Sequence, residues 1–231
     1  MTQTTSEFIF FKVKPSVRLE DPDSEEGEGL LSIFRNTQHE SGHQSSAWGH
    51  SVDDDSSIVW AVNWTDARGS ASTDNLTPYL DPAAQPPTAI YATLSPPLCS
   101  AAALSDNPVT ELCVLSFANS LSIPEMKQLN KDLINFRAAH VERLPEESRP
   151  NSWSMGHVDR PSMVQHAKSP NGQAVLHLLV VGWDSVDAHK KARETEQFVS
   201  SVSPIREKTL GAIPGLEVKH VSFHQIKKRV T

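Results

Sequence analysis

The chain has 231 residues, a formal net charge of −7 and 38% hydrophobic residues. This apolar content allows one large or two small hydrophobic cores, and no apolar run approaches the roughly 20 residues that cross a bilayer. The negative charge disfavours nucleic acid as the main partner. The first residues lack the charged and long apolar regions of a signal peptide, so we expect a cytoplasmic protein with no membrane partner and with free cysteine thiols.

The first half of the chain predicts strands, one helix and then a segment without long helices. Residues 66–108 contain seven prolines, and proline removes a backbone donor and breaks helices. The predicted elements are strands at residues 8–13, 46–52, 58–64 and 90–94, a helix from residue 21 to about residue 39, and a turn at residues 53–55.

The second half predicts the order β-α-β-β-α-β of a ferredoxin-like unit. Its first helix starts at a capping box of Ser122 and Glu125, and its second is one continuous amphipathic helix after Asp184 or Ser185. The strands are predicted at residues 111–117, 152–158, 174–183 and 216–226. The buried helical faces are predicted at Met126, Leu129, Leu133, Phe136, His140 and Leu144, and at Ala188, Ala192, Thr195, Val199 and Val202.

Two short motifs recur in the same order in both halves, which indicates an internal repeat. Trp48-Gly49-His50 matches Met155-Gly156-His157, and each of these strands precedes a strand that ends in tryptophan, Trp64 or Trp183. We therefore predict a first ferredoxin-like repeat over residues 1–98 with a degenerate, proline-rich second helix, a linker at residues 99–108, and a second repeat over residues 109–231.

These motifs also resemble a known family. The pattern Gly42…Trp48-Gly49-His50-Ser51-Val52-Asp53…Val59…Trp64, and again Met155-Gly156-His157…Val180-Val181-Gly182-Trp183-Asp184-Ser185-Val186-Asp187-Ala188-His189, is similar to the antibiotic biosynthesis monooxygenase (ABM) group of the dimeric α+β barrel superfamily. It most resembles the tandem-domain fungal branch and covers residues 8–64 and 111–226. The resemblance implies an α+β fold in which two ferredoxin-like repeats face each other within one chain and form a pseudo-dimeric barrel.

The resemblance also implies a range of activities. Some ABM members are cofactor-free oxygenases of aromatic polyketides, others use haem, and others isomerise, cyclise or decarboxylate their substrates or have no known activity. We expect a tailoring enzyme of secondary metabolism without cofactor, a monooxygenase or related cyclase or isomerase, whose partner is a small aromatic or polyketide-like substrate. The alternative is a non-catalytic small-molecule-binding or interaction protein of the same fold, and a homodimer is left open.

The candidate site residues are histidines and tryptophans in predicted strands. An imidazole in an apolar pocket can act as a base near neutral pH, and His157 is the expected catalytic base. Tryptophans can form an aromatic wall for a flat substrate, although most buried tryptophans only pack in a core. The expected substrate-binding residues are Trp153, His177, Trp183 and His220, and weaker first-half candidates are Trp48, His50, Trp60 and Trp64.

One metal motif is present in the sequence. His39-Glu40-Ser41-Gly42-His43 fits H-E-x-x-H, which binds zinc when both histidines lie on one helical face. Gly42 and the strand after it place the motif at a helix end, so we expect no metal there. The sequence also lacks a glycine-rich phosphate loop and a nucleophile elbow, which disfavours nucleotide cofactors and serine hydrolysis.

Overall fold

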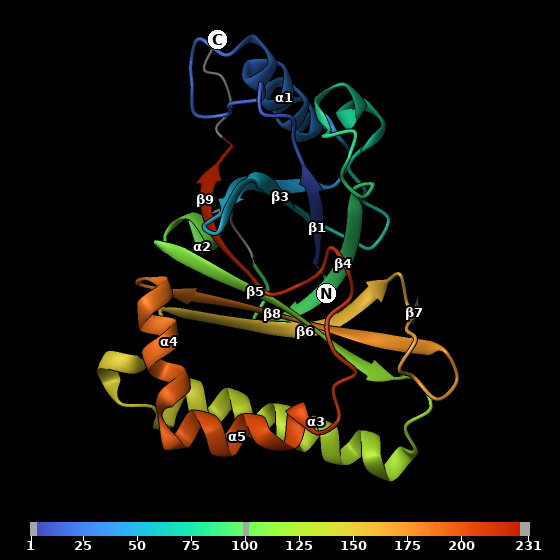
Figure 1. Cartoon of the computed structure of the whole chain (residues 1–231), viewed down its shortest axis with the longest axis vertical. Coiled ribbons are helices and arrows are strands. Elements are labelled where there is room, and N and C mark those ends of the chain that lie inside the picture. Colours follow the sequence, from blue (N-terminus) through green and yellow to red (C-terminus); the bar gives the residue numbers. More distant parts are fainter. Residues whose placement is uncertain (1–3, 99–101, 227–231) are drawn as a thin grey trace.

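Eight strands close into an antiparallel barrel in the computed structural model, which describes residues 4–98 and 102–226 (Figure 1). The order around the ring is β5-β9-β2-β3-β1-β4-β6-β8, and β8 pairs back with β5. The first-half elements are β1 (Thr5–Lys12), α1 (Glu25–Asn36), the 3₁₀ turn Thr37–His39, β2 (His43–Ser51), β3 (Asp54–Trp64), the 3₁₀ turn Asp74–Tyr79 and β4 (Thr88–Ser95).

The second half contributes the rest of the ring and most of the helices. Its elements are α2 (Ala102–Ser105), β5 (Val109–Ala118), α3 (Ile123–Ala138) with a π-helical turn Ala139–Arg143, the 3₁₀ turn Glu146–Ser148, β6 (Ser152–Arg160), the short β7 (Val164–Gln165), β8 (Gln173–Trp183), α4 (Val186–Glu194), α5 (Glu196–Arg206) and β9 (Lys219–Gln225).

The two halves arrange their strands in the same way. The first half has the order β4-β1-β3-β2, and the second half has the matching order β9-β5-β8-β6. The pairs β2–β9 and β4–β6 then join the halves into the ring. A closed antiparallel ring leaves no long unpaired strand edge, so its backbone donors and acceptors are satisfied within the ring.

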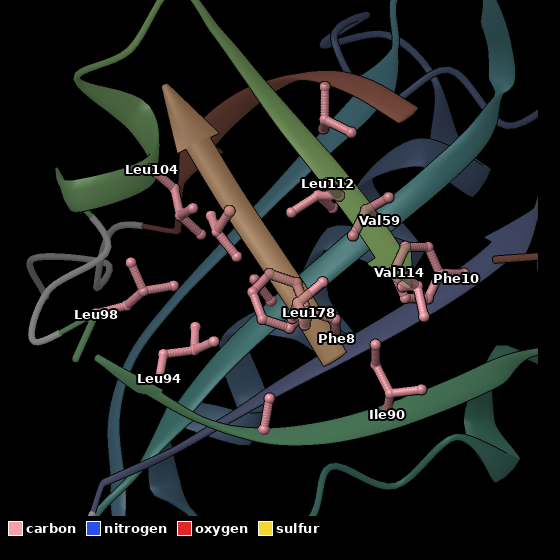
Figure 2. Packing of buried hydrophobic residues seen from close by; sticks show 14 of the residues in the cluster. Phe8, Phe10, Val59, Ile90, Leu94, Leu98, Leu104, Leu112, Val114 and Leu178 are labelled. Atoms are coloured by element: carbon pink, nitrogen blue, oxygen red, sulfur yellow. The ribbon is translucent and has the colours of Figure 1, made fainter. Parts of the chain in front are cut away.

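Two-residue alternation along each strand divides the apolar side chains between the inside and the outside of the barrel. The interior is filled by side chains from both halves, including Phe8, Val59, Ile90, Leu112 and Leu178 (Figure 2). The alternate residues face outward and need a second layer to cover them.

Helices supply that second layer on opposite sides of the barrel (Figure 1). Helix α1 covers the first-half sheet, and its Leu30 and Phe34 pack with Trp60 and Trp64. Helices α3 and α5 cover the second-half sheet around Phe136, Trp153 and Phe198. No helix in the described residues is long and apolar enough to cross a membrane.

The predicted α+β class is confirmed, and each predicted strand is present, most with small extensions; the last strand is shorter than predicted, because β9 covers only Lys219–Gln225 of residues 216–226. The turn predicted at residues 53–55 is shorter, because Asp54 already belongs to β3. Residues 99–101 of the predicted linker, with Cys99, lie outside the described residues. The rest of that linker is partly folded, since Leu104 of α2 is buried in the barrel core.

The continuous helix predicted after Asp184 is wrong. Thr195 has extended backbone angles (φ −72°, ψ 145°) and caps a new helix, because its hydroxyl accepts from the Phe198 N–H. The break rotates the buried face, so Phe198 and Ile205 are buried whereas Val199 is exposed. Met126 of the predicted α3 face is also exposed, because the first turns of α3 are solvent-exposed and its buried face begins only at Leu129.

Candidate functional site

A cavity of about 240 Å³ lies between the second-half sheet and its helices. Strands β5, β6, β8 and β9 form one side, and α3, α4 and α5 form the other. Its deep part is apolar, with buried Phe136, Trp153, Leu179, Phe198 and Ile205 among the lining residues. Because an apolar cavity of about 150 Å³ takes up benzene, this one has room for a ligand of one or two rings.

One carboxylate lies among these apolar residues. Glu111 points outward from β5 toward the helices, and its Oε2 accepts the indole N–H of Trp183 at 3.1 Å. The same oxygen lies 3.4 Å from Nε2 of His189, whose imidazole stacks on the Trp183 ring at 4.9 Å and 17°. Helix α4 positions His189 one turn after its cap, where the Ser185 hydroxyl accepts from the Ala188 N–H.

Burial changes the acidity of this group. It raises the pKa of Glu111 to about 7, and the Trp183 hydrogen bond and the Arg193 charge only partly oppose that rise. Burial also lowers the pKa of His189 to about 3, helped by the nearby His220, Arg193 and His140. At neutral pH Glu111 therefore exchanges its proton readily, while His189 is uncharged, which is the state that a general base and its relay need.

A third group extends the contact toward the surface. Nδ1 of His189 lies 2.8 Å from Nε2 of the partly exposed His220 on β9. If Nε2 of His189 carries the proton, it faces the Glu111 carboxylate and Nδ1 accepts from His220. If Nδ1 carries the proton, it donates to His220 and the bare Nε2 faces Glu111. The three side chains thus connect the cavity to the surface through one hydrogen bond, between His189 and His220, and one longer contact of 3.4 Å, between His189 and Glu111.

Two other titratable groups line the cavity and are poorly suited to acid-base work. The His140 Nδ1 contacts the Phe136 carbonyl at 2.9 Å, and burial lowers the pKa of His140 to about 4. Burial raises the pKa of Cys113 to about 12, so its thiol stays protonated and is a weak nucleophile.

Only some of the second-half residues predicted for the site lie at the cavity. Trp153 and His220 line the cavity, and Trp183 lies behind it, where it binds Glu111. His177 and His157 pair across β8 and β6 with ring centroids 3.9 Å apart, but neither lines the cavity.

His157 as the catalytic base is the prediction that this geometry disfavours. Its strand position aligns it with His177 near the far end of β6, and its side chain is exposed to solvent rather than enclosed in an apolar pocket. The neighbouring His177 is buried, and burial lowers its pKa to about 3.

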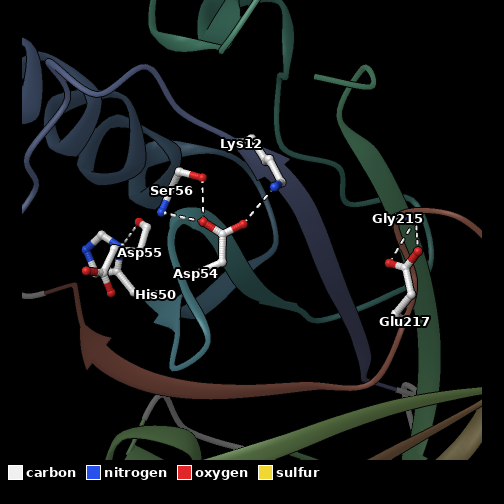
Figure 3. A network of polar contacts seen from close by, with 7 residues as sticks. All are labelled: Lys12, His50, Asp54, Asp55, Ser56, Gly215 and Glu217. Carbon is white, nitrogen blue, oxygen red and sulfur yellow. Dashed lines mark hydrogen bonds and ion pairs between the residues drawn. The ribbon is translucent and has the colours of Figure 1, made fainter. Parts of the chain in front are cut away.

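Of the first-half tryptophans, Trp48 borders a surface hollow of about 280 Å³ with Leu31 and Arg35 of α1, whereas Trp60 and Trp64 are enclosed in the core. Trp60 and Trp64 are buried under α1 and the 65–80 segment, and Trp48 stacks on His224 at 4.8 Å. His50 borders a surface hollow of about 690 Å³, but its Nδ1 lies 2.6 Å from the Asp55 carbonyl (Figure 3). The β2–β3 turn that holds His50 is itself fixed by Asp54, which bonds Ser56 and pairs with Lys12 (Figure 3).

The sequence did not single out Glu111, which lies in the apolar run ELCVLSF. One signal was available, because a charged residue on the outward face of a buried strand needs a partner or a raised pKa. His189 belongs to the family-like segment, but only the fold shows that it contacts Glu111.

The H-E-x-x-H motif lacks the helical geometry that zinc binding requires. His39 ends a 3₁₀ turn and His43 begins β2, so the two side chains do not share a helix face. Over the part of the chain that the structure describes, no group of three or more His, Cys, Asp or Glu side chains is arranged to hold a metal ion.

Solved structures with the same fold are found over nearly the whole chain. An anthrone oxidase-like protein has a TM-score of 0.61 at 10% identity, with 100% of this chain and 96% of that chain covered. A candidate monooxygenase from Fusobacterium nucleatum subsp. nucleatum has a TM-score of 0.53 at 13% identity, covering 98% and 94% of the two chains. A candidate chlorite dismutase has a TM-score of 0.55 at 9% identity, covering 98% and 96%.

No family model and no curated protein matches the sequence. The structural neighbours carry the names of different activities, and identities this low indicate a shared fold rather than a shared reaction. The chain has a mixed α+β fold with a large antiparallel sheet, which it shares with these solved structures.

Proposed function

We propose that this chain is a cofactor-independent monooxygenase-type enzyme that removes a proton from a small aromatic or polyketide-like substrate of secondary metabolism. The observation that carries the proposal is Glu111, a carboxylate with a pKa of about 7 at the edge of an apolar cavity. The names of the structural neighbours, which include a candidate monooxygenase and an anthrone oxidase-like protein, are in keeping with it.

We also propose that the barrel consists of two ferredoxin-like repeats. The matching strand orders support this, as does the register of two glutamates. Glu7 pairs with Val62, two residues before Trp64, and Glu111 pairs with Val181, two residues before Trp183. Each glutamate accepts the indole N–H of its own tryptophan. Two equivalent pairs at equivalent positions are better explained by a repeat than by chance.

The cavity suits a substrate that is acidified by its own aromatic system. Phe136 packs edge to face on Trp153 and on Phe198, and a substrate ring lying against this aromatic wall would bring an activated C–H toward Glu111. Transfer of that proton to Glu111 leaves a delocalised carbanion, and the dry walls keep competing water away from it.

The carbanion can supply the electrons that reduce oxygen. For an activated methylene the balance is R₂CH₂ + O₂ → R₂C=O + H₂O. Two C–H bonds break and one C=O bond forms. The substrate gives up four electrons, one oxygen atom enters the product and the other leaves in water. No further reductant is needed, which is why the reaction can proceed without a cofactor.

The proton that Glu111 takes up must leave before the next turnover. His189 and His220 offer a route, because their contacts with Glu111 and with each other lead from the cavity to the partly exposed β9 edge. A proton can enter His189 at Nε2 while another leaves from Nδ1 toward His220, with the ring kept stacked on Trp183; the N–H proton then returns to Nδ1, by exchange with solvent, before the next turnover.

An oxygen-uptake assay tests the proposal. 2-Indanone is a suitable probe because it has two fused rings, as the cavity allows, and its methylenes are acidified by the aromatic ring and the carbonyl. The chain should accelerate oxygen consumption and indane-1,2-dione formation, with a rate that rises with pH around pH 7 as Glu111 ionises. Glu111→Gln keeps an acceptor for the Trp183 N–H but removes the base, so its rate should fall by roughly 10²- to 10⁴-fold.

Two outcomes would contradict the proposal, one for the role of Glu111 and one for the reaction type. Equal rates for the wild type and Glu111→Gln would exclude Glu111 as the base. Exchange of substrate C–H for deuterium without oxygen uptake would instead point to an isomerase or cyclase that uses the same carbanion.

A further inference from the structure

The mouth of the cavity carries two arginines that form no ion pair with any carboxylate that the structure describes. Arg193, in the last turn of α4, and Arg206, in the last turn of α5, both line the cavity, and both are exposed. Within the described residues neither forms an ion pair or a side-chain hydrogen bond. Their positions at helix C-termini are favourable for cations, which explains why they remain there without carboxylate partners.

The charge of these arginines reaches the floor of the cavity. Arg193 lowers the pKa of Glu111 and of His189 and His220, and both arginines act on Cys113. The other lining residues near the open end are Thr209, Val218 and His220. Among the lining residues described, Glu111 is the sole carboxylate, and it lies behind them on β5. The mouth is therefore positive on a chain whose net charge is −7.

We propose that Arg193 and Arg206 bind a carboxylate on the substrate, so that the enzyme acts on an aromatic acid whose ring enters the apolar part of the cavity. This inference rests on the proposed function for its chemistry but not for its binding site. Guanidinium groups match carboxylates in shape and charge, and charge-assisted hydrogen bonds are stronger than neutral ones.

The geometry gives the acid group two roles. It anchors the ring with one end at the mouth, so that the opposite end reaches Glu111 and the interior walls. It also stays in the solvated part of the site, so the carboxylate keeps much of its hydration while it pairs with the arginines. A neutral ligand of the same shape would gain the apolar contacts but not the ion pairs.

Isothermal titration calorimetry with two isosteric probes tests the inference. 2-Naphthoate and 2-naphthamide have the same ring and nearly the same shape, but only the first is charged. We expect the wild type to bind the carboxylate at least about tenfold more tightly than the amide. Arg193→Gln combined with Arg206→Gln should remove that preference and leave the amide affinity unchanged. Added salt should weaken binding of the carboxylate alone.

Lys191→Gln is the matched control, because Lys191 is an exposed cation on the same helix α4 but does not line the cavity. It should leave the preference intact. The inference is overturned if the amide binds as tightly as the carboxylate, if neither probe binds at millimolar concentration, or if the control has the same effect as the arginine variants.

The binding assay also separates the two proposals. Selective binding of naphthoate without any oxygen uptake by the enzyme on aromatic acids would leave the acid site in place and reject the oxygenase function. Oxygen uptake on neutral aromatic substrates without a preference for acids would do the reverse.

Discussion

Each half of the barrel buries a tryptophan against a glutamate, and the two pairs differ in what covers them. In the first half Trp64 donates to Glu7 at 2.8 Å, and in the second half Trp183 donates to Glu111 at 3.1 Å. The strand registers are the same in both halves. Over the first pair the cover includes a loop that contacts both residues, whereas helices α3, α4 and α5 cover the second.

The loop leaves no room beside Glu7. A Cβ atom on Gly69 would lie 2.3 Å from the Trp64 ring, so the loop backbone itself rests on the indole. The Ala71 N–H donates to Glu7 at 2.9 Å, and Arg160 holds the Gly69 carbonyl at 2.9 Å. Glu7 is fully buried and is held by two donors to one oxygen, so it serves as a structural acceptor.

The helices leave a cavity beside Glu111. His189 takes the place of the loop backbone on the tryptophan ring, and α3 and α5 stand far enough from the sheet to enclose about 240 Å³. The same pair of residues is therefore sealed by direct packing in the first half and borders a cavity in the second. Four predictions test this contrast, from the largest expected effect to the smallest.

The largest effect should appear in catalysis. Glu111→Gln should lose roughly 10²- to 10⁴-fold in oxygen uptake, because the base is removed. Glu7→Gln is the matched variant in the other half, and it should keep the wild-type rate, since Glu7 is fully buried under the loop whose Ala71 N–H it accepts. Equal losses in both variants would show that the two glutamates act only through the stability of the barrel.

The second effect concerns stability, and here the two halves should behave alike. Trp64 and Trp183 are each 1% exposed, so replacing either with alanine should cost about 3–5 kcal/mol in unfolding free energy. Denaturant titration of both variants measures this. A much smaller cost for Trp183→Ala would mean that the second-half tryptophan is loosely packed against its cavity.

The third effect is a pH dependence that follows from the raised pKa of Glu111. A carboxyl whose folded pKa of about 7 exceeds its unfolded value of 4.5 stabilises the fold below pH 4.5, and this stabilisation is lost as the pH rises through 7. Glu111→Gln does not titrate, so its free energy of unfolding relative to that of the wild type should rise by about 2–3 kcal/mol as the pH goes from 5 to 8.

The wild type alone cannot isolate the effect of Glu111, because the buried histidines change the free energy of unfolding in the opposite direction as the pH rises. The difference between the wild type and Glu111→Gln removes their contribution. His177 and His189 have pKa values lowered to about 3, so their contribution is lost as the pH falls below their unfolded value of 6.5. Unfolding curves at both pH values measure the difference between the two proteins. A difference that does not change with pH would show that Glu111 is solvated in the folded protein.

The smallest effect should come from His157. Its side chain is exposed and does not line the cavity, so His157→Ala should change stability by less than about 0.5 kcal/mol and leave oxygen uptake unchanged. His220→Gln is the informative partner, because it interrupts the contact with His189 and should slow turnover at the step that returns the proton. Thermal melts and rate measurements on both variants show which of the two histidines contributes to turnover.

The fold was more accessible from the sequence than the site was. Period-two apolar patterns located the strands, and the capping box at Ser122 and Glu125 located the start of α3, because these features depend on neighbouring residues only. The break at Thr195 was missed because the charged and apolar spacing continues through it. It depends on a single residue that adopts an extended conformation to cap α5.

The sequence by itself determined the strands, the position of each tryptophan within them and the absence of a long helix from the proline-rich stretch of the first half. All of these follow from side-chain periodicity and from the backbone limits of proline. Only the tertiary structure decided which polar groups work together. Glu111, His189 and His220 come from β5, α4 and β9, which are far apart in the sequence. The closing strand pairs and the helical cover bring His189 to 3.4 Å from Glu111 and to 2.8 Å from His220. Their acidity is likewise a property of the assembled core, since it is burial that raises the pKa of Glu111 and lowers that of His189.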